Sequence, residues 1–285
     1  MAESVASGSV DAAALPERCP VVKSIEDCGR WAQHNIRVLI DTLGGTPSEL
    51  REVADAFRKV TISTAFSGIA APEVSLGAIG TTLAHYASNI GVHIETPIPE
   101  CLFAVEINEE AQRELLLLPK PPLHLSADMT SCMHETVRNV VVPQISRMSW
   151  DDLVKIFTND KAVLSTMPCI CHPGQHCEFG RAMIHIAGPP CVDWSPEGHQ
   201  KGWDGNTVAP FLAWIAQRLK VQEDGILHEN VPNFKPEALA ALLGEHYICS
   251  SVILCPTMFG VPSVRRRRYT WLRYQYRLAT HTQQT

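Results

Sequence analysis

The chain has 285 residues, of which 45% are hydrophobic and 19% charged, with a formal net charge of −6. This composition is typical of a water-soluble globular protein, and the acidic balance excludes a protein that coats nucleic acid along its whole surface. No apolar run approaches the roughly 20 residues that cross a bilayer, which excludes a transmembrane helix.

The first residues lack a basic start followed by an apolar core, so no secretion signal is predicted. Ten cysteines in a chain of this length do not make a disulfide scaffold. We therefore expect reduced thiols inside a cell, in the nucleus if the source is a eukaryote and otherwise in the cytoplasm. Secretion is not expected.

Residues 1–23 are small and polar and predict a disordered tail. Residues 24–60 predict a helical segment that is interrupted at Gly44-Gly45 and begins again near Pro47, a residue favoured at the first helical position. From residue 61 to residue 285 we expect one main domain.

Short β-type runs alternate with helical patterns through the main domain. Such alternation predicts an α/β fold with a mostly parallel twisted sheet and helices on both faces, which binds ligands at the carboxyl ends of its strands. Residues 129–180 do not fit this alternation and are predicted to be an insertion. The expected strands are 61–66, 101–106, 123–128, 181–188, 225–230, 246–255 and 268–276, and the expected helices are 72–89, 108–118, 208–219 and 235–244.

The first candidate site follows the first expected strand, where Ser67-Gly68 precedes a helix. Glycine lets a ligand approach the backbone, and a helix N-terminus offers free N–H groups. Glu106 ends the second strand, where an acid can accept hydrogen bonds from ribose hydroxyls, and Asp128 ends the third. These residues predict a nucleotide-like cofactor, although a tight turn with a surface carboxylate would give the same pattern.

The second candidate is Cys191, which follows a strand and Gly188-Pro189-Pro190. Two prolines fix the path of the chain, as a positioned nucleophile requires, although a buried structural thiol is the alternative. The glycines at 198, 202 and 205 predict a loop that bends around a substrate. Glu229, at a later strand end, is a candidate acid or hydrogen-bond partner whose pKa burial would raise.

The third candidate is the arginine run at residues 265–268. In a strand, alternate side chains point to opposite faces, so Arg265 and Arg267 would face the site together. No acidic residue follows Glu245, which suits a local contact with phosphate. A solvated basic end and a nuclear address remain alternatives.

Five segments, in this order, resemble the motifs of the DNA cytosine-5 methyltransferases over residues 61 to about 275: "FSGIAAPE", "FAVEINEEA", "AGPPCVDWSPEG", "HENV" and "FGVPSVRRRRY". The resemblance implies a Rossmann-like methyltransferase fold for residues 61–285 and S-adenosylmethionine as the cofactor. It implies methyl transfer to C5 of cytosine in double-stranded DNA, through a covalent cysteine adduct at C6 of a base flipped out of the duplex.

The resemblance also implies a role for each matching residue. Cys191 would be the nucleophile, Glu229 would bind N3 and the exocyclic amine, and Arg267, with Arg265 close by, would contact O2. Ribose would bind Glu106 and adenine Asp128. The full set of expected cofactor contacts is Phe66, Ser67, Gly68, Ile69, Glu106, Ile107, Asp128, Met129 and Pro189.

The chain departs from the family pattern at three places. Val192 and Ser263 stand where glutamine is common, and no target-recognition region or final Gly-Asn motif precedes the last residue, Thr285. We therefore expect a second chain or domain to supply target recognition. The alternatives are methylation of transfer RNA, or a truncated, inactive relative that acts as a regulatory or partner subunit.

The segment "CICHPGQHC" gathers cysteine and histidine inside the predicted insertion. Cys169, Cys171, His176 and Cys177 are candidate zinc ligands. However, only one residue separates Cys169 from Cys171, and His172 and His176 each adjoin a cysteine, which a single tetrahedral site accommodates poorly. We therefore expect no metal here, and a loop near the DNA-facing side instead.

Overall fold

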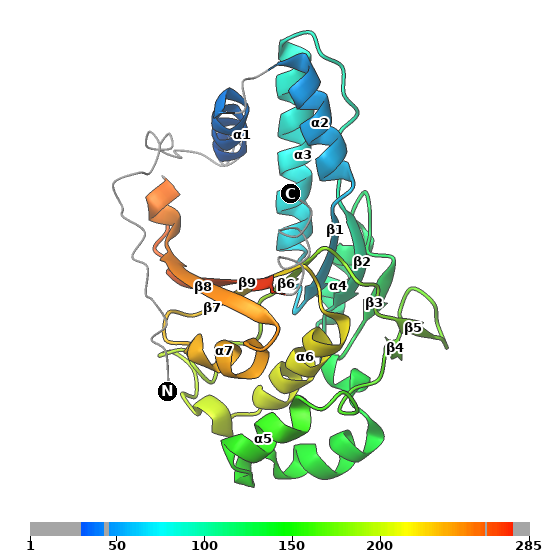
Figure 1. Cartoon of the computed structure of the whole chain (residues 1–285), viewed down its shortest axis with the longest axis vertical. Coiled ribbons are helices and arrows are strands. Elements are labelled where there is room, and N and C mark those ends of the chain that lie inside the picture. Colours follow the sequence, from blue (N-terminus) through cyan, green and yellow to red (C-terminus); the bar gives the residue numbers. More distant parts are fainter. Residues whose placement is uncertain (1–29, 43–45, 260, 276–285) are drawn as a thin grey trace, which may run out of the picture.

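The computed structural model describes residues 30–42, 46–259 and 261–275, and its centre is a seven-stranded sheet (Figure 1). The strand order in this sheet is β3-β2-β1-β6-β7-β9-β8. The strands are β1 (Thr61–Ala65), β2 (Glu100–Val105), β3 (His124–Ser126), β6 (Ile184–Ala187), β7 (Gly225–Asn230), β8 (Tyr247–Leu254) and β9 (Arg267–Tyr274).

Five neighbouring strands of this sheet are parallel, and β9 is antiparallel to both of its neighbours. β1 pairs with β2 on one side and with β6 on the other, so the direction of strand progression reverses between β1 and β6. β9 lies between β7 and β8. This is the predicted Rossmann-like α/β fold, and the reversal makes the carboxyl ends of β1 and β6 the expected ligand site.

Helices cover both faces of the sheet (Figure 1). One group comprises α1 (Arg30–Thr42), α2 (Pro47–Arg58) and α3 (Ala71–Asn89), which share a small apolar core. The other comprises α5 (Trp150–Phe157), α6 (Val208–Val221) and α7 (Glu237–Leu243), which pack into the main core. α4 (Glu109–Leu116) packs beside β2 and β3 through Leu115.

Local sequence explains where several helices begin. Thr46 and Glu49 form a capping box at α2, and Pro47 occupies its first turn. Asn108 caps α4 by accepting hydrogen bonds from two backbone N–H groups, and Ser149 caps α5. Each cap satisfies N–H groups that a helix start leaves without partners, and so fixes the residue at which the helix begins.

A buried polar network connects β1, β6 and α6. The Trp214 indole donates to Nε2 of His185 at 2.9 Å, so the neutral imidazole carries its proton on Nδ1 and donates it to Ser63 Oγ at 2.7 Å. Burial lowers the pKa of His185 well below its ordinary value, which keeps the ring neutral. Beside it, Arg218 and Glu223 form an ion pair in which both side chains are at most 1% exposed.

Residues 129–180, which are predicted to be an insertion, contribute side chains to the main core. They contain α5, three short helices and a hairpin of β4 (Thr166–Pro168) and β5 (His176–Glu178). The short helices are Met129–Cys132, Val137–Val141 and Val142–Arg147. Met133, Leu153 and Phe157 pack in the same apolar cluster as Trp214 of α6. This segment therefore supplies the layer that covers one face of α6.

The predicted strands and helices of the main domain match the observed ones to within a few residues. β7 occupies the predicted range 225–230, α3 begins one residue before the predicted start at 72, and β9 begins one residue before 268. The expected tail at residues 1–23 lies outside the described residues, and the domain boundaries remain predictions. Among the described helices, none combines the length and apolar character of a bilayer-spanning segment.

The buried ion pair predicts a large difference between two adjacent substitutions. Glu223→Ala leaves Arg218 charged and buried, and we expect a loss of about 3–5 kcal/mol in the free energy of unfolding. Asp224→Ala removes a half-exposed ion pair with Arg181 and should cost less than about 1 kcal/mol. Urea denaturation of both variants measures the two losses, and equal losses would contradict a special role for the buried pair.

Candidate active site at the carboxyl ends of the strands

The turn between β1 and α3 is unusually strained. Phe66, Gly68 and Ala70 all have left-handed backbone conformations, with φ of 55°, 55° and 65°. The left-handed region is unfavourable for phenylalanine and alanine, so the surrounding structure must hold them there. Ser67 contributes by donating its backbone N–H to Val105 O at 3.3 Å. Such strain is typical of ligand-binding turns.

Glu106, directly after β2, holds this turn in place. Its Oε2 accepts from the Gly68 N–H at 2.7 Å and its Oε1 from the Asn108 N–H at 2.8 Å. The residue is only 8% exposed. A carboxylate has about four lone-pair sites, so two remain for hydroxyl donors of a ligand.

Two large apolar side chains lie in solvent beside this carboxylate. Ile69 is 72% exposed and Ile107 is 74% exposed, although each adjoins a buried residue in the sequence. Exposed apolar groups next to a polar anchor are typical of a site that binds an amphipathic ligand such as a nucleoside.

Asp128 and Met129 follow β3 and play different parts. The Asp128 carboxylate accepts from the Thr130 N–H at 2.8 Å and from the Thr130 hydroxyl at 2.7 Å, and so caps the short helix at 129–132. Met129 is 2% exposed and packs in the main core. The buried Met129 side chain therefore anchors the backbone next to Asp128 in the core.

Cys191 lies half-buried in the loop that follows β6. Gly188 donates its N–H to Ala65 O at 3.4 Å, which joins this loop to the end of β1. After the two prolines, the N–H groups of Trp194 and Ser195 donate to Cys191 O at 2.9 and 2.7 Å. The cysteine thus stands at the start of a tight turn and lies outside the apolar core.

Asp193, which the sequence patterns did not single out, organises the rest of the loop. It is 2% exposed and accepts from both the N–H and the hydroxyl of Thr207, at 3.1 and 2.5 Å. A side chain at Gly205 would collide with this carboxylate, and one at Gly198 with the Val192 carbonyl. Gly198 and Gly205 therefore let the loop fold against itself, and the bending of this loop around a substrate stays a prediction.

Glu229 and Arg267 form an ion pair beside the Cys191 loop. Arg267 Nε lies 2.9 Å from Glu229 Oε1, with the side chains 19% and 32% exposed. A Cβ at Gly188 would lie 3.2 Å from Glu229 Oε2, and the Asn230 side-chain amide donates to Pro189 O at 3.5 Å. Burial raises the pKa of the Glu229 carboxyl, while Arg267 and Arg265 oppose that rise.

Neighbouring residues on both strands point away from this pair. His228 is fully buried among aromatic rings, and burial lowers its pKa to about 3. The Arg268 guanidinium donates to Pro232 O at 2.9 and 3.2 Å and to Ser251 Oγ at 3.3 Å. The alternation between Glu229 and His228, and between Arg267 and Arg268, follows from the pleat of the strands.

Arg265 lies in the segment just before β9, and its positive charge opposes the rise in the pKa of Glu229.

The cysteine- and histidine-rich segment contributes to a second cluster of side chains, which does not include Cys191, Glu229 or Arg267. His124, Cys169, His172 and Cys177 place their ligand atoms within 4.8 Å of one another. Two of the four candidate ligands named from the sequence are not members of this set: Cys171, whose Sγ is 3.8 Å from Pro122 O and whose thiol neighbours that of Cys169, and His176, which is exposed. His124 lacked any signal in the sequence because it lies 45 residues before Cys169.

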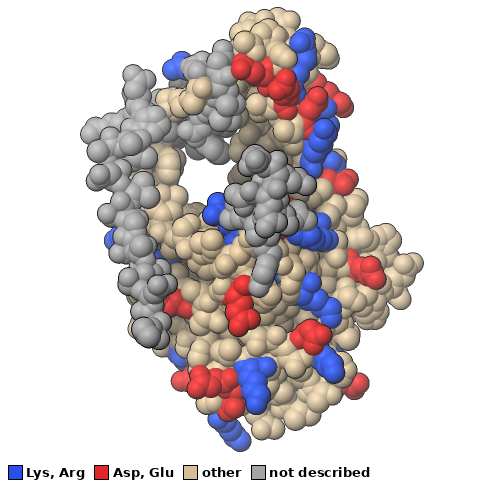
Figure 2. All heavy atoms as spheres, in the orientation of Figure 1, with Lys and Arg blue, Asp and Glu red and all other residues tan. Residues whose placement is uncertain are grey.

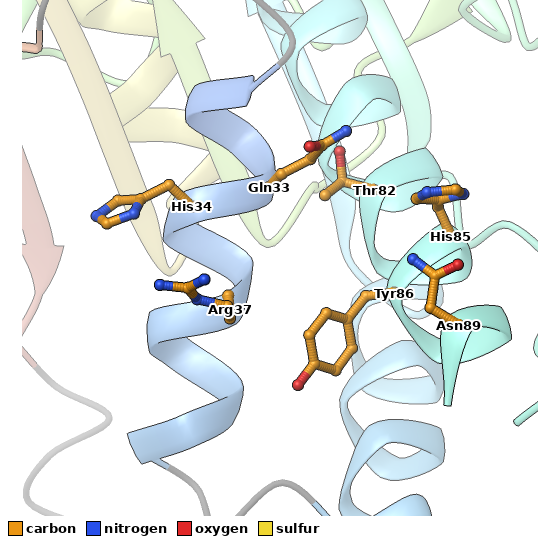
Figure 3. Close-up of a pocket in the computed structure, with 7 residues that line it drawn as sticks. All are labelled: Gln33, His34, Arg37, Thr82, His85, Tyr86 and Asn89. Carbon is orange, nitrogen blue, oxygen red and sulfur yellow. The ribbon is translucent and has the colours of Figure 1, made fainter. Parts of the chain in front are cut away.

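A cavity of about 340 Å³ lies between α1 and the second half of α3 (Figure 3). In this view Gln33 and Tyr86 lie between the helices, whereas His34 and Arg37 point away from α3. Its lining residues do not converge on one point, and the cavity lies at the end of α3 opposite to the strained turn. We therefore assign it no part in the active site.

Charged side chains are interspersed over the visible face of the molecule (Figure 2). Among the described residues on that face, lysine and arginine do not form a continuous basic band. On the visible face, a contact with a polyanion would therefore depend on local basic groups rather than on a continuous positive field.

Comparisons with known proteins give likenesses to solved structures alone, at low identity. No protein-family model and no curated protein matches the sequence. Similar solved structures include a candidate DNA modification methyltransferase encoded within an E. coli prophage (17% identity, TM-score 0.40), S. pombe Dnmt2 methyltransferase (18%, 0.40) and the Entamoeba histolytica methyltransferase EhMeth (18%, 0.43).

Each of these matches covers 76% of this chain and, in the same order, 47%, 50% and 53% of the other chain. The chain thus spans about half the length of these proteins. Its own strand order, with β9 antiparallel between β7 and β8, agrees with the expected Rossmann-like α/β sheet.

The geometry predicts that the pKa of Glu229 depends on Arg267 and hardly at all on Arg268. Carboxyl-selective NMR titration should find this pKa above the ordinary value for glutamate. Arg267→Met should raise it further, because the favourable charge at 2.9 Å is removed. Arg268→Met, the same chemical change one residue along, should leave it nearly unchanged. Equal shifts in both variants would contradict the assigned ion pair.

Proposed function

We propose that this chain is the catalytic part of an enzyme that transfers a methyl group from S-adenosylmethionine to C5 of cytosine in DNA. The observation that carries the proposal is the Glu229–Arg267 ion pair beside the loop that presents Cys191. A thiol after β6, a carboxyl with a raised pKa on β7 and a guanidinium on β9 thus come from neighbouring strands at one edge of the sheet. Glu106 and the strained turn lie at the same edge.

The residues around Glu106 fit S-adenosylmethionine. The two free lone-pair sites of the carboxylate suit the two ribose hydroxyls, and Ile69 and Ile107 offer apolar faces to the adenine ring. Ala70 begins α3 without a side-chain cap, which leaves backbone N–H groups for the cofactor carboxylate. When bound there, S-adenosylmethionine supplies the electrophilic methyl group.

Cys191 acts as the nucleophile in the proposed mechanism. Its thiolate forms a bond to C6 of cytosine, and the electron pair of the C5–C6 double bond becomes available at C5, where the methyl group is accepted. Removal of the C5 proton by a base such as water then restores the double bond. The S–C6 bond breaks in the same process, and its electron pair returns to Cys191.

Glu229 stabilises the base while it carries extra charge. Its raised pKa favours the protonated carboxyl, which can donate a hydrogen bond to N3 and accept one from the exocyclic amine. Arg267 holds this carboxyl in place and lies where its cationic group can also interact with O2. The two side chains therefore lower the free-energy barrier to the proposed attack at C6.

Access to C6 requires the base to leave the duplex, because the ring edge is stacked inside it. Arg265 and Arg266 provide cations at the rim of the site for the DNA backbone. Recognition of a target sequence by a second chain or domain remains part of the proposal. Transfer RNA is the competing substrate, and the assay below includes it.

The cofactor assignment predicts a loss of affinity in a conservative variant. Glu106→Gln replaces one acceptor oxygen with a donor that faces a backbone N–H, and should weaken S-adenosylmethionine binding about 10-fold or more. Isothermal titration calorimetry measures the dissociation constant. Glu110→Gln, an exposed site on α4, is the matched control, and equal affinities in the two variants would exclude Glu106 from the cofactor site.

The nucleophile assignment predicts that Cys191→Ser lowers methyl transfer to DNA by at least about 10³-fold. Labelled S-adenosylmethionine and cytosine-containing DNA or transfer RNA provide the measurement. Cys249→Ser, on β8, is the control and should keep most activity. DNA containing 5-fluorocytosine should form a covalent complex with the wild-type chain, because fluorine at C5 leaves no proton to remove.

Two outcomes would overturn this proposal. Equal background transfer by the wild-type chain and Cys191→Ser, with intact cofactor binding, would show that Cys191 is not a nucleophile. Preferential methylation of transfer RNA would keep the chemistry and replace the substrate.

A further inference from the structure

The cluster of His124, Cys169, His172 and Cys177 lies outside the proposed catalytic residues. His124 is the first residue of β3, at the edge of the sheet, and the other three come from the β4–β5 hairpin. Cys169 is 7% exposed, and the other three are partly buried. Two thiols and two imidazoles therefore gather from segments 45 residues apart.

We propose that these four residues bind one zinc ion in a structural site. Cysteine sulfur and histidine nitrogen are the ligands that zinc prefers, and a set of two cysteines and two histidines closes a tetrahedral site without an open position for catalysis. The inference does not depend on the proposed methyl transfer.

The distances between these atoms agree with tetrahedral coordination. Zn–S and Zn–N bonds of about 2.3 and 2.0–2.1 Å at tetrahedral angles place sulfur and nitrogen about 3.6 Å apart. Cys169 Sγ lies 3.4 Å from His172 Nδ1 and 3.9 Å from His124 Nδ1, and Cys177 Sγ lies 3.5 Å from His172 Nδ1. Side chains that merely met by hydrogen bonding would not need all four atoms around one centre.

The hairpin backbone explains how such close neighbours in sequence can bind one ion. Cys169 N–H donates to Gln175 O at 3.0 Å, and Gln175 N–H donates to His172 O at 3.0 Å. Gly174 has a φ of 79°, a left-handed conformation that glycine adopts easily and that turns the chain at the tip. One member of each adjacent Cys/His pair thus faces the centre.

A backbone contact brings the fourth ligand to this hairpin. Ile170 N–H donates to Leu125 O at 2.7 Å, so the loop docks on β3 directly beside His124. β3 is a short strand that pairs only with β2 within the described sheet. A metal ion here would hold this edge strand against the hairpin. The few hydrogen bonds of so short a strand hold it there only weakly.

The first test is the zinc content of the full chain, purified without chelators and measured by inductively coupled plasma mass spectrometry. We expect about one zinc ion per chain. Cys177→Ser and His172→Ala should lose most of it. Cys171→Ser and His176→Ala are the matched controls, with the same changes at adjacent positions outside the cluster, and should retain it.

A second measurement uses the wild-type chain alone and does not depend on the folding of any variant. After removal of zinc by a chelator, cobalt should give the ligand-field absorption of a tetrahedral site together with thiolate-to-cobalt charge transfer. Zinc should displace cobalt. Zinc added to the metal-free chain should raise the melting temperature again and release protons from the thiols. Magnesium should do none of these.

Three results would overturn the inference. The first is wild-type protein with no stoichiometric zinc and no tetrahedral cobalt spectrum. The second is the same zinc content in Cys177→Ser and Cys171→Ser. The third is a Cys169–Cys177 disulfide in protein purified under reducing conditions, which would account for the proximity of the two thiols without a metal.

Discussion

The position of β9 between β7 and β8 is the constraint on which the candidate site depends. In the antiparallel register, Glu229 faces Tyr269 and Asn230 faces Arg268. Arg267 lies two residues before Tyr269, so the pleat places it on the same face as Glu229. A register shifted by one residue would direct Arg267 away and turn Arg268 toward the site. A strand added in parallel would place Arg267 at the opposite end of β7. The 2.9 Å ion pair is therefore a consequence of topology.

Two carboxylates at the same edge of the sheet are held in different ways, and the difference matches their proposed roles. Glu106 accepts from two backbone N–H groups, which cannot move without the strands, so its geometry is fixed. Glu229 is held by a side chain, and burial raises its pKa against the opposing arginines. A fixed acceptor suits recognition of ribose, whereas a carboxyl whose pKa is raised by burial suits stabilisation of a changing charge.

The sheet and the strand-end residues were predictable because strand periodicity and strand ends are local features of the sequence. Gly68, Glu106 and Glu229 each follow a short apolar run, and parallel strands bring such ends together. Asp193 was not predictable, because its burial depends on Thr207 and Gly205, which a folded loop places beside it. The layer at 129–180 was missed as well, because its helices are too short to show a clear period.

The same reasoning explains why the spacing of cysteine and histidine in the sequence did not predict the proposed metal site. Spacing describes ligands on one local segment, whereas here β3 contributes His124 across the sheet edge. The hairpin needs only one member of each adjacent pair, so the neighbours that argued against a tetrahedral site, Cys171 and His176, have other environments. β3 leads within two residues to Asp128, the expected adenine contact. A rigid connection at the start of this short strand would therefore help to hold the far side of the cofactor site, which only β2 otherwise supports within the described sheet.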